Sequence, residues 1–152
     1  MPQNPPKGYQ RICPYLYYED AAAAVDWITR AFGFTERLRM PGPGGRVAHA
    51  EVELGDGVLM LGEPMGDDFK SPKALGVSTS SVYVYVDDVD AHCARAKDAG
   101  AEIIREPEDQ FYGDRMYGAK DLEGHEWFFG QHVRDVSPEE LQQAAAAMAA
   151  TS

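Results

Sequence analysis

Residues 20–33 read DAAAAVDWITRAFG, and residues 87–100 read DDVDAHCARAKDAG. Each stretch opens on an aspartate, continues with apolar residues at helical spacing and ends at a glycine. The two stretches lie 67 residues apart, and Gly57 and Gly124 repeat that interval, each just before an apolar run. A repeat at a fixed period indicates two copies of one structural unit. We therefore expect two similar modules, with a ligand cleft where they close on each other.

Both stretches have the features of helices. Asp20 can accept hydrogen bonds from the unpaired N–H groups of a first turn, and Gly33 suits the left-handed position after a helix end. Asp87 and Gly100 bound the second helix in the same way. Apolar residues of the first helix recur at spacings that place them on one face; they are Ala21, Val25, Ile28 and Phe32. Near the C-terminus, Ser137 opens a capping box and predicts a short alanine-rich helix.

Strand-like segments surround each helix in the same order. They are rich in β-branched and aromatic residues and are separated by glycine-containing turns; they span 11–18, 34–40, 46–54 and 57–62 in the first copy and 80–86, 102–106, 115–120 and 125–131 in the second. The order β-α-β-β-β, present twice, predicts an α+β fold of two tandem modules. A polar stretch between them indicates a linker that can also act as a lid.

These boundaries divide the chain into five parts. We expect an N-terminal arm at 1–9, a first module at 10–63, a linker or lid at 64–79, a second module at 80–132, and a C-terminal helix and tail at 133–152. A chain of 152 residues with 44% hydrophobic residues is large enough to bury a core.

Charge and composition narrow the partners. A net charge of −11 disfavours nucleic acid and anionic membrane surfaces, and it permits a cationic ligand. The two cysteines form no CxxC pair, which fits a reducing compartment. The first residues lack the apolar region of a signal peptide, and no apolar run approaches the roughly 20 residues of a membrane span. We expect a cytoplasmic protein without nucleic-acid or membrane partners.

Side-chain alternation selects the faces that would line a cleft. In the strand at 80–86, Tyr83 and Tyr85 lie opposite a valine face, and in the strand at 46–54, His49 and Glu51 lie opposite a small apolar face. Tyrosine, with an apolar body and a polar tip, suits a half-wet concave surface. The alternative is that these polar faces contact bulk water on an exposed sheet.

Several phrases give the chain a family resemblance. They are Pro14-Tyr15-Leu16, Val47-Ala48-His49-Ala50-Glu51, Phe111-Tyr112-Gly113-Asp114-Arg115, and Asp121-Leu122-Glu123-Gly124-His125-Glu126-Trp127. With the duplicated modules, residues 10–132 resemble the vicinal oxygen chelate superfamily of glyoxalases, extradiol dioxygenases and bleomycin-resistance proteins, and the phrases are similar to its PhnB-like branch. The resemblance implies that the two sheets form an open, barrel-like cup, which holds a divalent metal in the enzymes.

The metal-ligand positions implied by the resemblance carry unsuitable side chains. They correspond to Cys13, Met60 or Leu61, Ser81 and Phe128. Metals of this superfamily need nitrogen or carboxylate donors, so we expect no metal and no cofactor. A displaced metal site is the alternative; its donors would be His49, Glu51, Glu126 and His132.

Three functions follow from these observations. The first is a homodimeric, metal-free protein that binds a small organic molecule, cationic ligands included, as the resemblance to bleomycin-resistance proteins implies; its ligand-binding residues would be Tyr15, Tyr17, His49, Glu51, Tyr83, Tyr85, Tyr112, Arg115, Glu126 and Phe128. The second is a lyase, isomerase or dioxygenase that uses the displaced metal site, or a metal-free enzyme that uses His49 with Glu51 or Tyr112 with Arg115. The third is a structural or regulatory module. For Arg115 the alternative role is a salt bridge with Asp114, Glu108 or Asp109.

Overall fold

The computed structural model describes residues 1–151, so Ser152, the last residue of the predicted tail, lies outside the described residues. The described chain forms eight strands, four α-helices and one 3-10 turn: β1 (Tyr15–Tyr17), α1 (Ala21–Phe32), β2 (Thr35–Pro41), η1 (Pro43–Gly45), β3 (Val47–Leu54), β4 (Gly57–Gly62), α2 (Pro72–Leu75), β5 (Ser81–Tyr85), α3 (Val89–Asp98), β6 (Glu102–Asp109), β7 (Asp114–Lys120), β8 (Glu126–His132) and α4 (Pro138–Thr151). The predicted α+β fold with two β-α-β-β-β modules and a C-terminal helix is confirmed.

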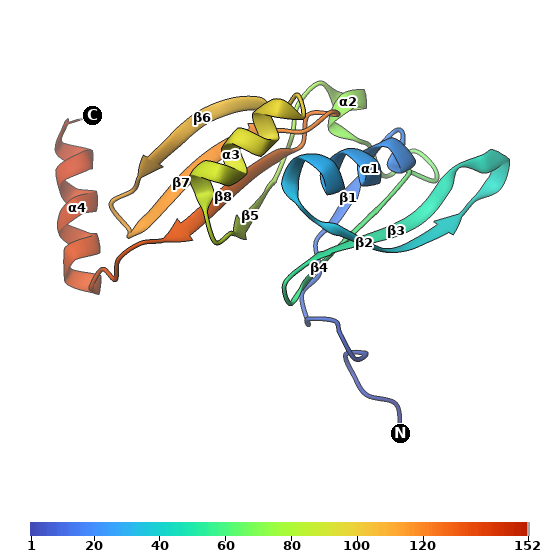
Figure 1. The fold of residues 1–152 in the computed structure, drawn as a ribbon, viewed down its shortest axis with the longest axis horizontal. Coiled ribbons are helices and arrows are strands. Elements are labelled where there is room, and N and C mark those ends of the chain that lie inside the picture. The colour runs from blue at the N-terminus through green and yellow to red at the C-terminus, as the bar shows by residue number, and fades with distance from the viewer. Residues whose placement is uncertain (152) are drawn as a thin grey trace.

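Each module builds its own four-stranded sheet (Figure 1). The strand order is β1-β4-β3-β2 in the first sheet, here called sheet A, and β5-β8-β7-β6 in the second, called sheet B. In both sheets the first strand pairs in parallel with the last, and the other pairs are antiparallel. Across residues 1–151 the two sheets share no strand pairing and do not close into a barrel.

The structural repeat has an offset of 68 residues at the first and last strands. Tyr15 pairs with Met60 in sheet A, and Tyr83 pairs with Phe128 in sheet B. The helix N-caps Asp20 and Asp88 follow the same offset, because Asp88, and not Asp87 as predicted, accepts the N–H of Ala91 and precedes α3. Two consecutive aspartates are equally suited to capping by chemistry, so only the geometry of the preceding strand selects between them.

The helix-facing sides of both sheets share one hydrophobic core with α1 and α3. Phe32, at the end of α1, is fully buried and packs its ring against Trp127 and Phe129 of the second module. The Trp27 indole donates to the Ala99 carbonyl at the end of α3. The two modules are therefore joined through their helices and core faces, and the opposite faces of both sheets remain uncovered by the other module.

A second connection between the modules is the turn at 121–125, which lies within the family-like phrase at 121–127. Asp121 is buried and accepts from the Tyr18 hydroxyl at 2.6 Å and from the Trp127 indole at 2.9 Å. Glu123 accepts the N–H groups of Glu19 and Asp20. His125 contacts the Tyr17 carbonyl at 2.7 Å, so this turn holds the segment that connects β1 to α1.

The linker and the C-terminus differ from each other in packing. The linker at 64–79 contains α2, whose N-cap Ser71 is fully buried, and Phe69 stacks on Tyr17 with ring centroids 4.8 Å apart. By contrast, α4 buries none of its residues Pro138–Thr151 and stands apart from the sheets (Figure 1). Ser137 accepts the N–H of Glu140, as the predicted capping box requires.

No helix within residues 1–151 is long and apolar enough to cross a membrane.

Candidate ligand-binding site

The candidate site lies on the two sheet faces that point away from α1 and α3, here called the open faces. On the open face of sheet A, Tyr15 is 39% exposed, and on that of sheet B, Tyr83 and Tyr85 are 41% and 62% exposed. Large aromatic side chains usually bury most of their surface. Their exposure on corresponding strands of both modules indicates a surface made to contact something else.

Four rings run in a row across the open face of sheet A. Phe69 packs on Tyr17, Tyr17 lies 5.2 Å from Tyr15, and Tyr15 lies 5.5 Å from the His49 imidazole between ring centroids. The hydroxyl of Tyr15 is 3.0 Å from His49 Nδ1, and His49 Nε2 is 2.8 Å from Glu51. When Glu51 is ionised it accepts a hydrogen bond from Nε2–H, which leaves Nδ1 as the acceptor for the Tyr15 hydroxyl. The three groups therefore form one continuous hydrogen-bond chain.

Glu51 is the centre of polar contacts on this face. It is only 3% exposed. Its second oxygen accepts from the Tyr9 hydroxyl at 2.6 Å, and the Arg37 guanidinium lies 3.5 Å away. Burial alone would raise the pKa of the Glu51 carboxyl, but hydrogen bonds from Tyr9 and His49 and the nearby charges lower it below its ordinary value. Glu51 is thus a charged group held in place by its neighbours.

Sheet B has a corresponding centre at Asp114. This carboxylate is also 3% exposed and accepts from the hydroxyls of Tyr83 and Tyr85 at 2.9 and 3.0 Å and from His132 at 2.9 Å. Burial acts to raise the pKa of Asp114, and these hydrogen bonds lower it overall. Burial and hydrogen bonds with Tyr112 and Asp114 raise the pKa of Tyr83, so Tyr83 stays a neutral donor.

Glycines make room for the rings on both open faces. A Cβ at Gly130 would lie 2.5 Å from the Tyr83 hydroxyl, and one at Gly62 would lie 2.7 Å from the Tyr15 hydroxyl. A Cβ at Gly118 would lie 2.8 Å from the Phe128 ring. The rings therefore lie across the neighbouring strand, where they present a flat surface.

The structure gathers most of the sequence-predicted residues on the open faces but separates one. Tyr15, Tyr17, His49 and Glu51 lie on sheet A, whereas Tyr83, Tyr85, Tyr112, Glu126 and Phe128 belong to sheet B and its turn. Arg115 points to the helix side of β7, where it pairs with Asp90 of α3 and with Asp109. Its placement corresponds to the salt-bridge role, with Asp109 as one of the predicted partners.

The residues at the superfamily metal positions do not fit a metal. Cys13 precedes β1 and donates to the Gln10 carbonyl, Met60 and Phe128 are apolar, and Ser81 begins β5. The displaced set does not converge either, because Glu126 and His132 lie at opposite ends of β8, about 20 Å apart at the rise of a strand. Among the described residues, no three His, Cys, Asp or Glu side chains form a group that could hold a metal ion.

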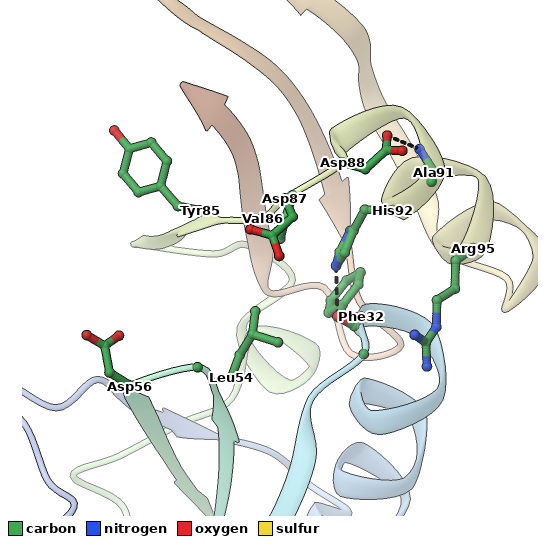
Figure 2. Close-up of a pocket in the computed structure, with 12 residues that line it drawn as sticks. Phe32, Leu54, Asp56, Tyr85, Val86, Asp87, Asp88, Ala91, His92 and Arg95 are labelled. Carbon is green, nitrogen blue, oxygen red and sulfur yellow. Dashed lines mark hydrogen bonds between the residues drawn. The ribbon is translucent and has the colours of Figure 1, made fainter. Parts of the chain in front are cut away.

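A cavity of about 460 Å³ also opens between the modules, and Tyr85 is among the residues that line it (Figure 2). Three of its polar side chains, Asp88, His92 and Arg95, make contacts that stabilise the fold. Asp88 caps α3, His92 contacts the Phe32 carbonyl at 2.7 Å and the Tyr117 hydroxyl at 2.6 Å, and Arg95 contacts carbonyls at the end of α1. We therefore assign this cavity to the junction between the modules.

His92 should make folding stability dependent on pH. Burial lowers the pKa of His92, as does the charge of Arg95, while the hydrogen bond to Phe32 acts in the opposite direction. A folded-state pKa below the ordinary histidine value of 6.5 means that the unfolded chain binds the proton more readily. The contribution is therefore complete above pH 6.5 and declines as pH falls below it, by at most about 1.4 kcal/mol per pH unit. Urea titrations of wild type and His92→Gln between pH 5 and 8 should show a flatter profile for the variant. A profile of unchanged slope would contradict this role.

Three residues of the open faces were not predicted. Tyr9 and Arg37 contact Glu51, and Asp114 binds both tyrosines of sheet B. Asp114 lies in one of the family-like phrases, which was the available signal. No signal in the sequence indicated Tyr9 and Arg37. They lie 42 and 14 residues before Glu51 in the chain, and such long-range contacts leave no periodic pattern.

Comparison with known proteins identifies the family. The profile of the Glyoxalase/Bleomycin resistance protein/Dioxygenase superfamily matches residues 10–129. The chain belongs to this superfamily. The match does not distinguish the branches of the superfamily, so membership of the PhnB-like branch stays a prediction.

Individual relatives agree with that assignment. The uncharacterized protein Rv0887c of Mycobacterium tuberculosis is 37% identical over 137 residues, which cover 88% of this chain and 81% of the relative. Among solved structures, TioX from Micromonospora sp. ML1 is 36% identical with a TM-score of 0.65 over 80% of this chain and 98% of that chain. TnmS3, an antibiotic binding protein from Streptomyces sp. CB03234, is 24% identical with a TM-score of 0.62 over 79% and 93% of the two chains.

Proposed function

We propose that the protein binds a small aromatic molecule, without a metal, against the tyrosines of its open faces. The observation that carries the proposal is the exposure of Tyr15, Tyr83 and Tyr85 on the open faces. Buried Asp114 orients Tyr83 and Tyr85 directly, and buried Glu51 acts on Tyr15 through His49. Glu51 and Asp114 are already paired with His49, Arg37 and His132. Stacking on the rings is therefore the main attraction, and the net charge of −11 disfavours anionic ligands.

We also propose that the binding unit is a homodimer in which sheet A of one copy faces sheet B of the other. Within one chain the modules contact each other through α1 and α3 and leave both open faces uncovered. Pairing the faces between copies would enclose a ligand between two tyrosine pairs. Light scattering during size-exclusion chromatography should give twice the 16.7 kDa mass of the chain, and a monomer at micromolar concentration would contradict the proposal.

Related proteins support the proposal without deciding the ligand. TnmS3 is described as an antibiotic binding protein, but at 24% identity it shares only the fold with this chain. We also propose that the protein belongs to the PhnB-like branch and that it is cytoplasmic.

Replacement of Tyr83 and Tyr85 should weaken aromatic binding. We expect Y83A/Y85A to reduce the affinity for 9-aminoacridine, a planar cation, about 30-fold, since each ring contributes about 1 kcal/mol of stacking. Isothermal titration calorimetry on the folded variants measures the change. The matched variant Y83F/Y85F keeps both rings and should bind within about threefold of wild type. Equal affinity of wild type and Y83A/Y85A for 9-aminoacridine would contradict the proposal. So would wild-type protein that binds anionic 2-naphthoate as tightly as 9-aminoacridine.

A second function is supported by the hydrogen-bond chain from Tyr15 through His49 to Glu51. This arrangement can accept a proton at the exposed Tyr15 hydroxyl position and move it toward the imidazole. An enzymatic function requires that a bound ligand is converted to product. We therefore expect wild type to convert the ligand and His49→Gln to leave it unchanged. Recovery of the unchanged ligand from both proteins would leave binding alone.

A further inference from the structure

The N-terminal arm is attached along the edge of sheet A. The Gln10 side chain donates to the Val58 carbonyl at 2.6 Å and accepts the Val58 N–H at 3.0 Å. Gln10 thereby pairs with both backbone groups of Val58 in β4. Val58 lies two residues before Met60, the β4 residue that pairs with Tyr15 at the start of β1. This anchor determines where the residues before Gln10 run.

From this anchor the arm turns onto the open face, where Tyr9 occupies the position above Glu51. The Tyr9 hydroxyl donates to Glu51 at 2.6 Å, a short distance typical of a hydrogen bond to a charged oxygen. The Arg37 guanidinium lies 4.4 Å from the centroid of the Tyr9 ring, in a cation–π contact. Gly8 has a φ of +87°, and an added Cβ would lie 3.2 Å from Arg37, so glycine permits this close approach.

The groups around Tyr9 define a chemistry. A buried carboxylate accepts one O–H, a guanidinium covers one ring face, and His49 holds the other carboxylate oxygen. A ring that carries a hydroxyl group satisfies all of these contacts. A ring without a donor would leave one oxygen of a buried charged group without its hydrogen bond, which is costly.

We propose that the Glu51–Arg37 pair is a subsite for a phenolic hydroxyl of the ligand, and that Tyr9 is its occupant within the chain. The inference rests on the proposed function and names the ligand class for the same site, a hydroxylated aromatic. Residues 1–8 are exposed apart from Pro5, which is half-buried, so few contacts besides those of Tyr9 and Gln10 hold the arm down. A ligand must displace Tyr9, which lowers its apparent affinity by the fraction of time that the subsite is free.

The test compares 2-naphthol with 2-methoxynaphthalene, which has the same ring system but no O–H donor. If Tyr9 occupies the subsite for about nine-tenths of the time, Tyr9→Ala should bind 2-naphthol about tenfold more tightly than wild type. The affinity for 2-methoxynaphthalene should stay within twofold. Adding Glu51→Gln to Tyr9→Ala should remove the gain for 2-naphthol, and Lys7→Ala, a change at an exposed arm residue, should resemble wild type.

Each result decides the inference. Unchanged or weaker binding of 2-naphthol by folded Tyr9→Ala would show that Tyr9 is a permanent part of the site. An equal gain in affinity for both compounds would show that the site accepts any aromatic ring. Either outcome would overturn the proposed hydroxyl subsite. Circular dichroism checks folding, and Tyr9→Phe, which keeps the ring, should give an intermediate gain. The proposed function fails separately, when Y83A/Y85A on sheet B leaves 9-aminoacridine binding unchanged.

Discussion

Replacement of Asp121 by alanine should lower the free energy of unfolding by about 3–5 kcal/mol, the range found when one partner of a buried charged network is removed. Asp121 accepts from Tyr18, Trp127 and the N–H groups of Glu123 and His125. Without the carboxylate, these donors remain in a region that water does not reach. Each unsatisfied buried group costs about 1–3 kcal/mol before relaxation.

Urea unfolding followed by circular dichroism measures this effect at a fixed protein concentration, because a dimer would make stability depend on concentration. Asp67→Ala is the matched control, since Asp67 is an exposed linker carboxylate, and it should change stability by less than about 0.5 kcal/mol. A loss below 1 kcal/mol for Asp121→Ala would show that the 121–125 turn does not hold the modules together.

Replacement of Phe32 by alanine should have an effect of similar size, about 3–5 kcal/mol, for a different reason. The Phe32 ring is fully buried between the modules and contacts Trp27, Trp127 and Phe129 with centroids 4.7–5.1 Å apart. Removing it opens a void that the rigid aromatic neighbours cannot fill. The loss combines the transfer free energy of the ring with the cost of the cavity.

The same urea experiment should separate burial from ring chemistry. Phe69→Ala removes a ring that is 52% exposed and should cost less than about 1.5 kcal/mol. Phe32→Leu refills most of the volume and should recover at least half of the loss. Equal destabilisation by Phe32→Ala and Phe69→Ala would mean that the junction between the modules is not part of the cooperative core.

The fold was largely predictable because its signals are local. Helix caps, apolar spacing and glycine turns depend on a few neighbouring residues, and the duplication placed them in order. The error at Asp87 is informative, because Asp87 and Asp88 have the same capping chemistry. Only the register of β5, which starts at Ser81 as a parallel partner of β8, determines which one precedes α3.

The candidate site was predictable where it depends on strand alternation. His49, Glu51, Tyr83 and Tyr85 share open faces because alternate residues of a strand point the same way. Arg115 was assigned to the site although it points to the helices, since the sequence did not show which parity of β7 faces α3. No such rule covers Tyr9, whose position depends on how the arm folds back.

The 121–125 turn has a consequence for how the protein can diversify. Apart from the Tyr18 hydroxyl that Asp121 accepts from, its hydrogen bonds with the first module reach main-chain atoms: the Tyr17 carbonyl and the N–H groups of Glu19 and Asp20. A main-chain atom is present whatever the side chain. The side chain of Tyr17 can therefore change during evolution while the junction stays intact, so the surface of the open face can vary without loss of the fold.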